Sequence, residues 1–170
     1  MVVLFRLLFA IFRSYRRPGI SLLETSVVAL HVWPNDLDLN LHMNSGRYVS
    51  MMDIGRIALL AETRLLDRVL GMRWRPVVGG ALIRYRRSLL PFERFEVRTR
   101  AVCWDEKWIY FEHILERDGE VCAEGYVRAL MRDDEGNVPT SELLAVAGDP
   151  DLESPPMPEK IARWYALELA

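Results

Sequence analysis

Chemically active side chains crowd into nine consecutive residues, 36–44, with the sequence Asp-Leu-Asp-Leu-Asn-Leu-His-Met-Asn. In an extended segment, the alternation with leucine and methionine would place Asp38, Asn40 and His42 on one side. A carboxylate and an imidazole at this spacing can move protons, and an amide can orient water. The same composition is also typical of an Asx-rich turn that caps a helix. Both interpretations remain open at this point.

The motif lies between a strand-like run and the longest helix-like run of the chain. Residues 26–33 are rich in β-branched and aromatic side chains, which predicts a strand that ends at Pro34. From Ser45 to about Leu70, apolar residues recur at helical spacing, which predicts one long helix that is buried over much of its surface. Asn44 or Ser45 is the expected cap, and Gly71 is the expected stop.

From residue 76 onward the pattern has period two. It predicts strands near 77–87, 95–104, 108–117 and 121–132. The polar segments 105–107 and 117–120 are typical of tight turns, so the strands that they join should pair antiparallel in sequence order. Residues 133–137 should close the last strand. The sequence therefore predicts an α+β domain, in which an antiparallel sheet of about five strands wraps around one long helix.

The chain divides by composition into a basic amphipathic segment 1–18, a single domain 19–138, and an extension 139–170 that ends in a short helix. Residues 2–12 are apolar except for Arg6, a run too short to span a bilayer, and they lack the pattern of a secretory signal. On a helical wheel Arg6, Arg13 and Arg17 share one side. The segment is either an interfacial membrane anchor or a helix that packs on the domain or on a dimer partner with its arginines in water.

Charge and cysteine usage exclude some functions. A net charge of −2 argues against nucleic acid as a partner, since phosphate binding needs concentrated positive charge. Cys103 and Cys122 lack metal or redox spacing, which favours buried free thiols in a reducing compartment. No pair of histidines has ligand spacing, so no metal is expected. We therefore expect a cytoplasmic protein, which would contact the inner membrane surface peripherally if residues 1–17 are the interfacial anchor.

The motif and the order of elements together resemble the hotdog-fold thioesterases. The resemblance is closest to the 4-hydroxybenzoyl-CoA thioesterase-like group and its thioesterase superfamily member 6 branch, and it covers about residues 27–132. It rests on segment 36–44, Arg47-Tyr48, Met52-Asp53, segments 84–88 and 95–100, and Trp104-Asp105. The resemblance implies hydrolysis of an acyl-CoA or other acyl thioester with no cofactor beyond the CoA of the substrate. It also implies a homodimer or homotetramer with acyl sites at the interface.

The resemblance also implies roles for the motif. Asp38 would act as base or nucleophile, Asn40 would orient the water or the carboxylate, and His42 would share a proton with the departing thiolate. Similar plant acyl-carrier-protein thioesterases add an acid from a second hotdog repeat, which this chain lacks. The backbone amides at the helix start are the expected oxyanion donors. They belong to Asn44, Ser45 and Gly46.

Three further polar residues receive competing interpretations. Asp53 is a second candidate acid, but its place along the helix favours a structural ion pair. Arg84 and Arg86 share a strand face and would hold the CoA phosphates, or else belong to a solvated basic strand or form ion pairs with Glu96 and Glu112. The functional alternatives are a non-catalytic acyl-binding or membrane-associated scaffold, and a hydratase or dehydratase, whose arrangement of histidine and acid is not found here.

Overall fold

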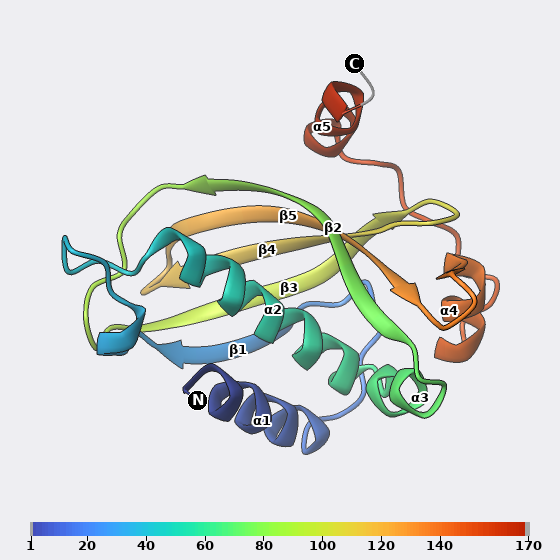
Figure 1. The fold of residues 1–170 in the computed structure, drawn as a ribbon, viewed down its shortest axis with the longest axis horizontal. Coiled ribbons are helices and arrows are strands. Elements are labelled where there is room, and N and C mark those ends of the chain that lie inside the picture. The colour runs from blue at the N-terminus through green and yellow to red at the C-terminus, as the bar shows by residue number, and fades with distance from the viewer. Residues whose placement is uncertain (1, 169–170) are drawn as a thin grey trace.

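A computed structural model describes residues 2–168, which form an antiparallel sheet and a set of helices packed against it (Figure 1). One antiparallel sheet carries the helix α2 across its face. The elements are α1 (Val2–Tyr15), β1 (Ser26–His31), the 3₁₀ turn η1 (Pro34–Asp36), α2 (Ser45–Glu62), α3 (Leu65–Gly71), β2 (Arg75–Tyr85), β3 (Arg94–Trp104), β4 (Ile109–Arg117), β5 (Glu120–Arg132), β6 (Asn137–Val138), α4 (Thr140–Ala147) and α5 (Glu159–Glu168).

The sheet runs in the order β1-β3-β4-β5-β2, and β6 pairs with β5. Two hairpins join β3 to β4 and β4 to β5, which confirms the predicted antiparallel pairing. Strand β2 precedes β3 in the sequence, but in the sheet it pairs with β5 and lies at an edge. The predicted α+β architecture is thus confirmed.

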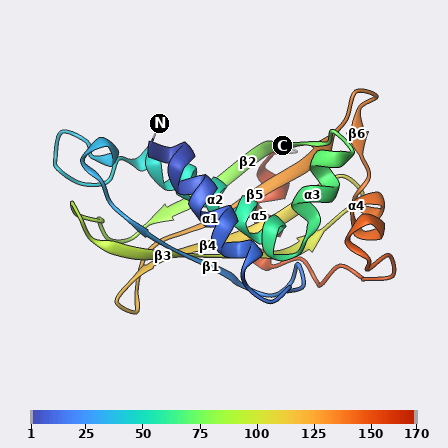
Figure 2. The same ribbon diagram turned by 90° about the horizontal axis from the view of Figure 1, so that it is seen from below.

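The core lies between α2 and the concave side of the sheet. Met51, Met52, Ala58 and Leu59 of α2 are almost completely buried, so the helix is covered on several sides as its composition predicted. Besides the sheet, the helix α1 also covers α2. It packs along α2 and β1 on the side away from β2 (Figures 1 and 2). Cys122 lies in this core, whereas Cys103 lies in a separate cluster with Tyr110 and Ile161 of α5; both are buried free thiols, as predicted. Burial raises the pKa of Cys103 to about 11.

The predicted single helix from Ser45 to Leu70 is wrong in one respect. Arg64 adopts a left-handed conformation with φ of 62°, which breaks the helical ladder and separates α2 from α3. The Arg64 side chain compensates with a hydrogen bond of 2.9 Å to the Arg17 carbonyl. The second helix ends at Gly71, as predicted. A further helix, α4, was not predicted; it buries Leu143 and Leu144 and ends at a left-handed Gly148.

Candidate functional site

The nine-residue motif folds back on itself as a tight turn. Leu37 and Met43 form an isolated antiparallel bridge, and the Asp38 amide donates to the His42 carbonyl at 2.8 Å. Leu41 turns the chain with a positive φ of 59°. Leu39, at the tip, is completely exposed. The motif is therefore not an extended segment with its polar groups on one side: the turn brings its two arms together and leaves the tip in solvent.

The turn holds the Asp38 carboxylate by one oxygen. Oδ1 accepts hydrogen bonds from the backbone amides of Asn40, at 2.8 Å, and of His42, at 3.3 Å. Within residues 2–168, Oδ2 has no hydrogen-bond or ion-pair partner. Asp38 is thus oriented by the backbone while one oxygen remains available for chemistry.

Asp38 lines a hollow of about 270 Å³ where the turn, the start of α2 and the end of β2 meet. The hollow also includes His42, Ser45 and Arg86, so it brings together four of the predicted site residues. The remaining lining residues are Met43, Tyr48, Tyr85, Arg87 and Ser88. The other predicted residues, Asn40, Asn44, Gly46 and Arg84, lie outside the lining.

The start of α2 supplies one available amide to this hollow. Asn44 caps the helix, since its Oδ1 accepts from the Gly46 amide at 2.9 Å. Its own amide donates to the Asp36 carbonyl at 2.8 Å. Of the three predicted donors, only the Ser45 amide lacks a partner within the described chain. Ser45, which lines the hollow, therefore carries an N–H at the positive end of the helix dipole that is available to a ligand.

Two tyrosines line the hollow that were not predicted from the sequence as site residues. Tyr48 and Tyr85 meet edge to face, with ring centroids 5.1 Å apart. The Tyr85 hydroxyl donates to the Ser45 carbonyl at 3.1 Å, and the Tyr48 hydroxyl accepts from the Leu89 amide at 3.3 Å. Burial raises the pKa of Tyr48, so this phenol stays protonated at neutral pH. Their spacing in the sequence gave no signal, because β2 and α2 meet only in the folded chain.

The first acid of the motif, Asp36, has a structural role. It is completely buried, and both of its oxygens accept from the Arg6 guanidinium, at 3.0 and 2.5 Å. The Trp33 amide donates at 2.9 Å, and Arg47 Nε lies 3.8 Å away. The expectation that the arginines of α1 would lie in water is therefore wrong for Arg6, which is only 6% exposed. A buried carboxylate needs a buried cation, and Arg6 supplies it.

The predicted CoA-binding arginines share one acid. Arg86 and Arg84 lie 3.1 and 3.8 Å from Glu124. The alternative partners were wrong, because Glu96 pairs with Arg94 and Arg98 and Glu112 pairs with Arg100. Strand β2 ends at Tyr85, so Arg86 is in the segment that leaves the sheet and reaches the hollow.

A second polar cluster lies farther along α2. Asp53 forms an ion pair with Arg56, as favoured above, and Arg56 Nη1 lies 3.2 Å from Nε2 of the fully buried His113. The other ring nitrogen of His113 lies 3.0 Å from Thr99 Oγ1. Burial, with a smaller effect of Arg56, lowers the pKa of His113 well below its usual 6.5. The cluster therefore holds a neutral imidazole in the core.

The model of the thioesterase-like superfamily matches residues 32–165. This chain belongs to that superfamily. It is 34% identical to Protein THEM6 of Xenopus laevis over 136 residues. This match covers 78% of this chain and 63% of the relative. It is 30% identical to Protein THEM6 of Drosophila melanogaster over 138 residues, and this match covers 79% of this chain and 69% of the relative.

A solved structure supports the fold. The 1,4-dihydroxy-2-naphthoyl-CoA thioesterase of Synechocystis superposes with a TM-score of 0.64 at 12% identity, covering 76% of this chain and 98% of that chain. The thioesterase-like superfamily and the hotdog fold inferred from the motif are thus confirmed, together with the relation to THEM6. The chain spans about two thirds of the length of the relatives named here, so the activity of the whole protein is a matter for proposal.

Proposed function

We propose that this protein hydrolyses acyl-CoA thioesters to the free acid and CoA, with Asp38 as base or nucleophile. The observation that carries the proposal is the Asp38 carboxylate itself. It lines the hollow at the start of α2, with Oδ1 held by two amides and Oδ2 without a partner among the residues that the structure describes. Membership of the thioesterase-like superfamily supports the reaction class.

In the proposed reaction, Oδ2 of Asp38 either attacks the thioester carbon or takes a proton from the water that does so. The carbonyl oxygen becomes an oxyanion, and the Ser45 amide donates to it at the positive end of α2. The C–S bond then breaks, and His42 shares a proton with the departing thiolate. In the nucleophilic variant, water hydrolyses the resulting anhydride and regenerates the carboxylate. Asn40 contributes through its backbone amide, which holds Asp38 in place.

The CoA portion is assigned to the arginines at the end of β2. Arg86 lines the hollow, and Arg84 extends the same basic face toward solvent, where it is 67% exposed. Guanidinium groups suit the CoA phosphates because they form paired hydrogen bonds with phosphate oxygens. Glu124 holds both arginines in the free protein and would have to release them when phosphate binds.

The test is hydrolysis of acyl-CoAs of graded chain length, followed by release of free thiol. Asp38→Asn is the informative variant, because Asn retains the Oδ1 acceptor that the turn needs. Asp133→Asn is the matched control, since Asp133 Oδ1 also accepts two backbone amides, at 2.9 and 2.8 Å, in a turn away from the hollow. Activity should be lost in Asp38→Asn and retained in Asp133→Asn. No hydrolysis of any substrate by the wild type would favour the non-catalytic acyl-binding scaffold.

We also propose that a second copy pairs along β2. This edge strand is exposed along most of its length, including Val77, Val78 and Leu82, and an open edge of this kind invites pairing with another chain. Val78→Lys with Leu82→Lys should convert a dimer to a monomer in light scattering. An unchanged mass would refute the edge as the contact.

A further inference from the structure

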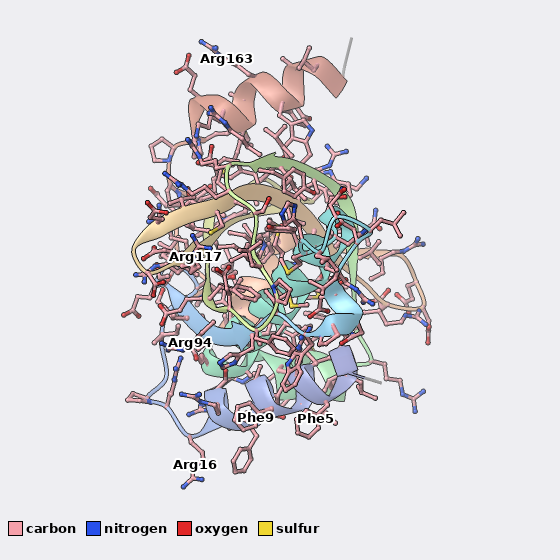
Figure 3. All side chains as sticks on the ribbon, turned by 90° about the vertical axis from the view of Figure 1, so that its left-hand side faces the viewer. Phe5, Phe9, Arg16, Arg94, Arg117 and Arg163 are labelled. Carbon is pink, nitrogen blue, oxygen red and sulfur yellow. The ribbon has the colours of Figure 1, made fainter. Side chains whose placement is uncertain are left out.

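The helix α1 buries polar side chains on its inner side, beside Val3, Leu7 and Ile11, and presents large apolar side chains outward. Arg6, Ala10 and Ser14 face inward and are 6, 3 and 2% exposed. The outward side is a stripe of large apolar residues, each at least half exposed. We call these residues the α1 stripe: Leu4, Phe5, Leu8, Phe9 and Phe12. Figure 3 shows Phe5 and Phe9 on the outer side of α1, away from the sheet.

Specific contacts fix this orientation. Arg6 donates to both oxygens of Asp36 and to the His31 carbonyl, so it holds the first half of the helix to β1 and the motif. At the other end, Glu62 of α2 accepts from Ser14 and from Arg17, at 3.3 and 2.9 Å. Rotation of the helix that buried the stripe would break both sets of polar contacts. The folded domain therefore presents the stripe to its surroundings.

The apolar surface continues from the helix onto the domain. A hollow of about 580 Å³ lies between Phe5 and Phe9 on one side and the end of β1 on the other, where Leu30 and the half-exposed Trp33 form its wall. Tryptophan and phenylalanine are the side chains that favour the boundary between acyl chains and headgroups.

Cations flank the stripe. The Arg13 and Arg16 guanidiniums stack on Phe9 and Phe12, at 5.8 and 5.4 Å from the ring centroids. Within the described chain, neither meets a carboxylate. The sequence contains no acidic residue before Glu24. An apolar stripe with basic residues at its border matches a lipid surface that carries negative headgroups.

The exposed area of the α1 stripe and the lengths of the described helices indicate that the partner is a bilayer surface. The five side chains expose roughly 500 Å², taking about 200 Å² for a fully exposed aromatic residue, whereas a stable protein interface needs about 800 Å² per partner. No described helix is long and apolar enough to cross a membrane. A surface of this size is sufficient for shallow insertion, which needs no complementary shape.

We propose that the α1 stripe docks this protein peripherally on anionic bilayers. In the docked state the stripe enters the acyl boundary, and Arg13 and Arg16 contact the headgroup phosphates. Through Arg6 and Asp36, the docked helix is joined directly to the segment that carries Asp38. The docking itself does not depend on the hydrolase activity proposed above.

The test is flotation of the full chain with phosphatidylcholine vesicles, with and without about 30 mol% phosphatidylserine. Wild type should float, more strongly with the anionic lipid. Leu4→Ser with Leu8→Ser should lower the partition coefficient about tenfold. The matched control is Leu70→Ser with Leu167→Ser, which changes two leucines that are 62 and 77% exposed elsewhere, and it should float like wild type.

Several outcomes would overturn the proposal. Failure of the wild type to float on either vesicle would refute it, and so would equal flotation of the two double variants. If Leu4→Ser with Leu8→Ser instead changes the mass in light scattering and leaves flotation intact, the stripe is a contact between copies. Thermal denaturation of both variants verifies that α1 stays folded. Asp38→Asn should float like wild type, so a failure of the hydrolase proposal leaves this test independent.

Discussion

The contact between Arg6 and Asp36 should be the most sensitive point of the N-terminal half. Arg6→Met keeps the aliphatic packing of the side chain but leaves the fully buried Asp36 carboxylate without its main partner. Breaking a buried ion pair in this way costs about 3–5 kcal/mol. The Trp33 amide still donates, and Arg47, 3.8 Å away, supplies part of the missing charge. We therefore expect a loss near the lower end, about 3 kcal/mol.

The measurement is the free energy of unfolding from urea denaturation, with an unchanged dependence on denaturant. Arg94→Met is the control, since the Arg94 pair with Glu96 is exposed and should contribute less than about 1 kcal/mol. Adding Asp36→Asn to Arg6→Met should restore much of the loss, because the uncompensated charge is gone. A cost of Arg6→Met no larger than that of Arg94→Met would refute the view that this pair holds α1 and the motif together.

Two further predictions concern the core under α2. Gly55→Ala should destabilise the protein by about 1–3 kcal/mol in urea denaturation, because the new Cβ would collide with Thr99 Oγ1. Gly71→Ala places its new Cβ with no atom within 4 Å and should be neutral or stabilising, so equal effects of the two substitutions would contradict this reasoning. The pKa of His113 is lowered by burial, so the unfolded chain binds more protons than the folded one below pH 6.5. Stability should therefore fall as pH falls below 6.5, by up to about 1.4 kcal/mol per pH unit from this group. His113→Gln should remove that part of the slope between pH 6.5 and 5, and parallel wild-type and variant curves would contradict it.

Hydrophobic periodicity was sufficient to predict the central helix and the hairpins of β3, β4 and β5, but not the places of β1 and β2 in the sheet. The alternation in β3, β4 and β5 reflects one buried face, and turn residues mark both hairpins. The helix break at Arg64 was not predictable in this way, because the apolar pattern continues through it into α3. The left-handed Arg64 makes a side-chain hydrogen bond to the carbonyl of Arg17, which is distant in sequence.

The candidate site was only partly predictable for a similar reason. The composition of the motif indicated chemistry, and Asp38, His42 and Ser45 do line one hollow. The turn at Leu41 makes Asp38 and His42 neighbours and places Asn40 outside the hollow. Which arginine of α1 would be buried depended on the position of Asp36 in the folded chain. The available signal was a lone arginine, Arg6, within an apolar run.

The most direct test of the central claim is the ratio of kcat/KM for Asp38→Asn to that for wild type, on the best acyl-CoA substrate. If the carboxylate performs the chemistry, the ratio should fall at least about 10²-fold, and by up to about 10⁴-fold, with the fold intact by circular dichroism. Asp133→Asn should remain within a few-fold of wild type. An Asp38→Asn enzyme as active as Asp133→Asn would contradict the assignment of Asp38 as base or nucleophile.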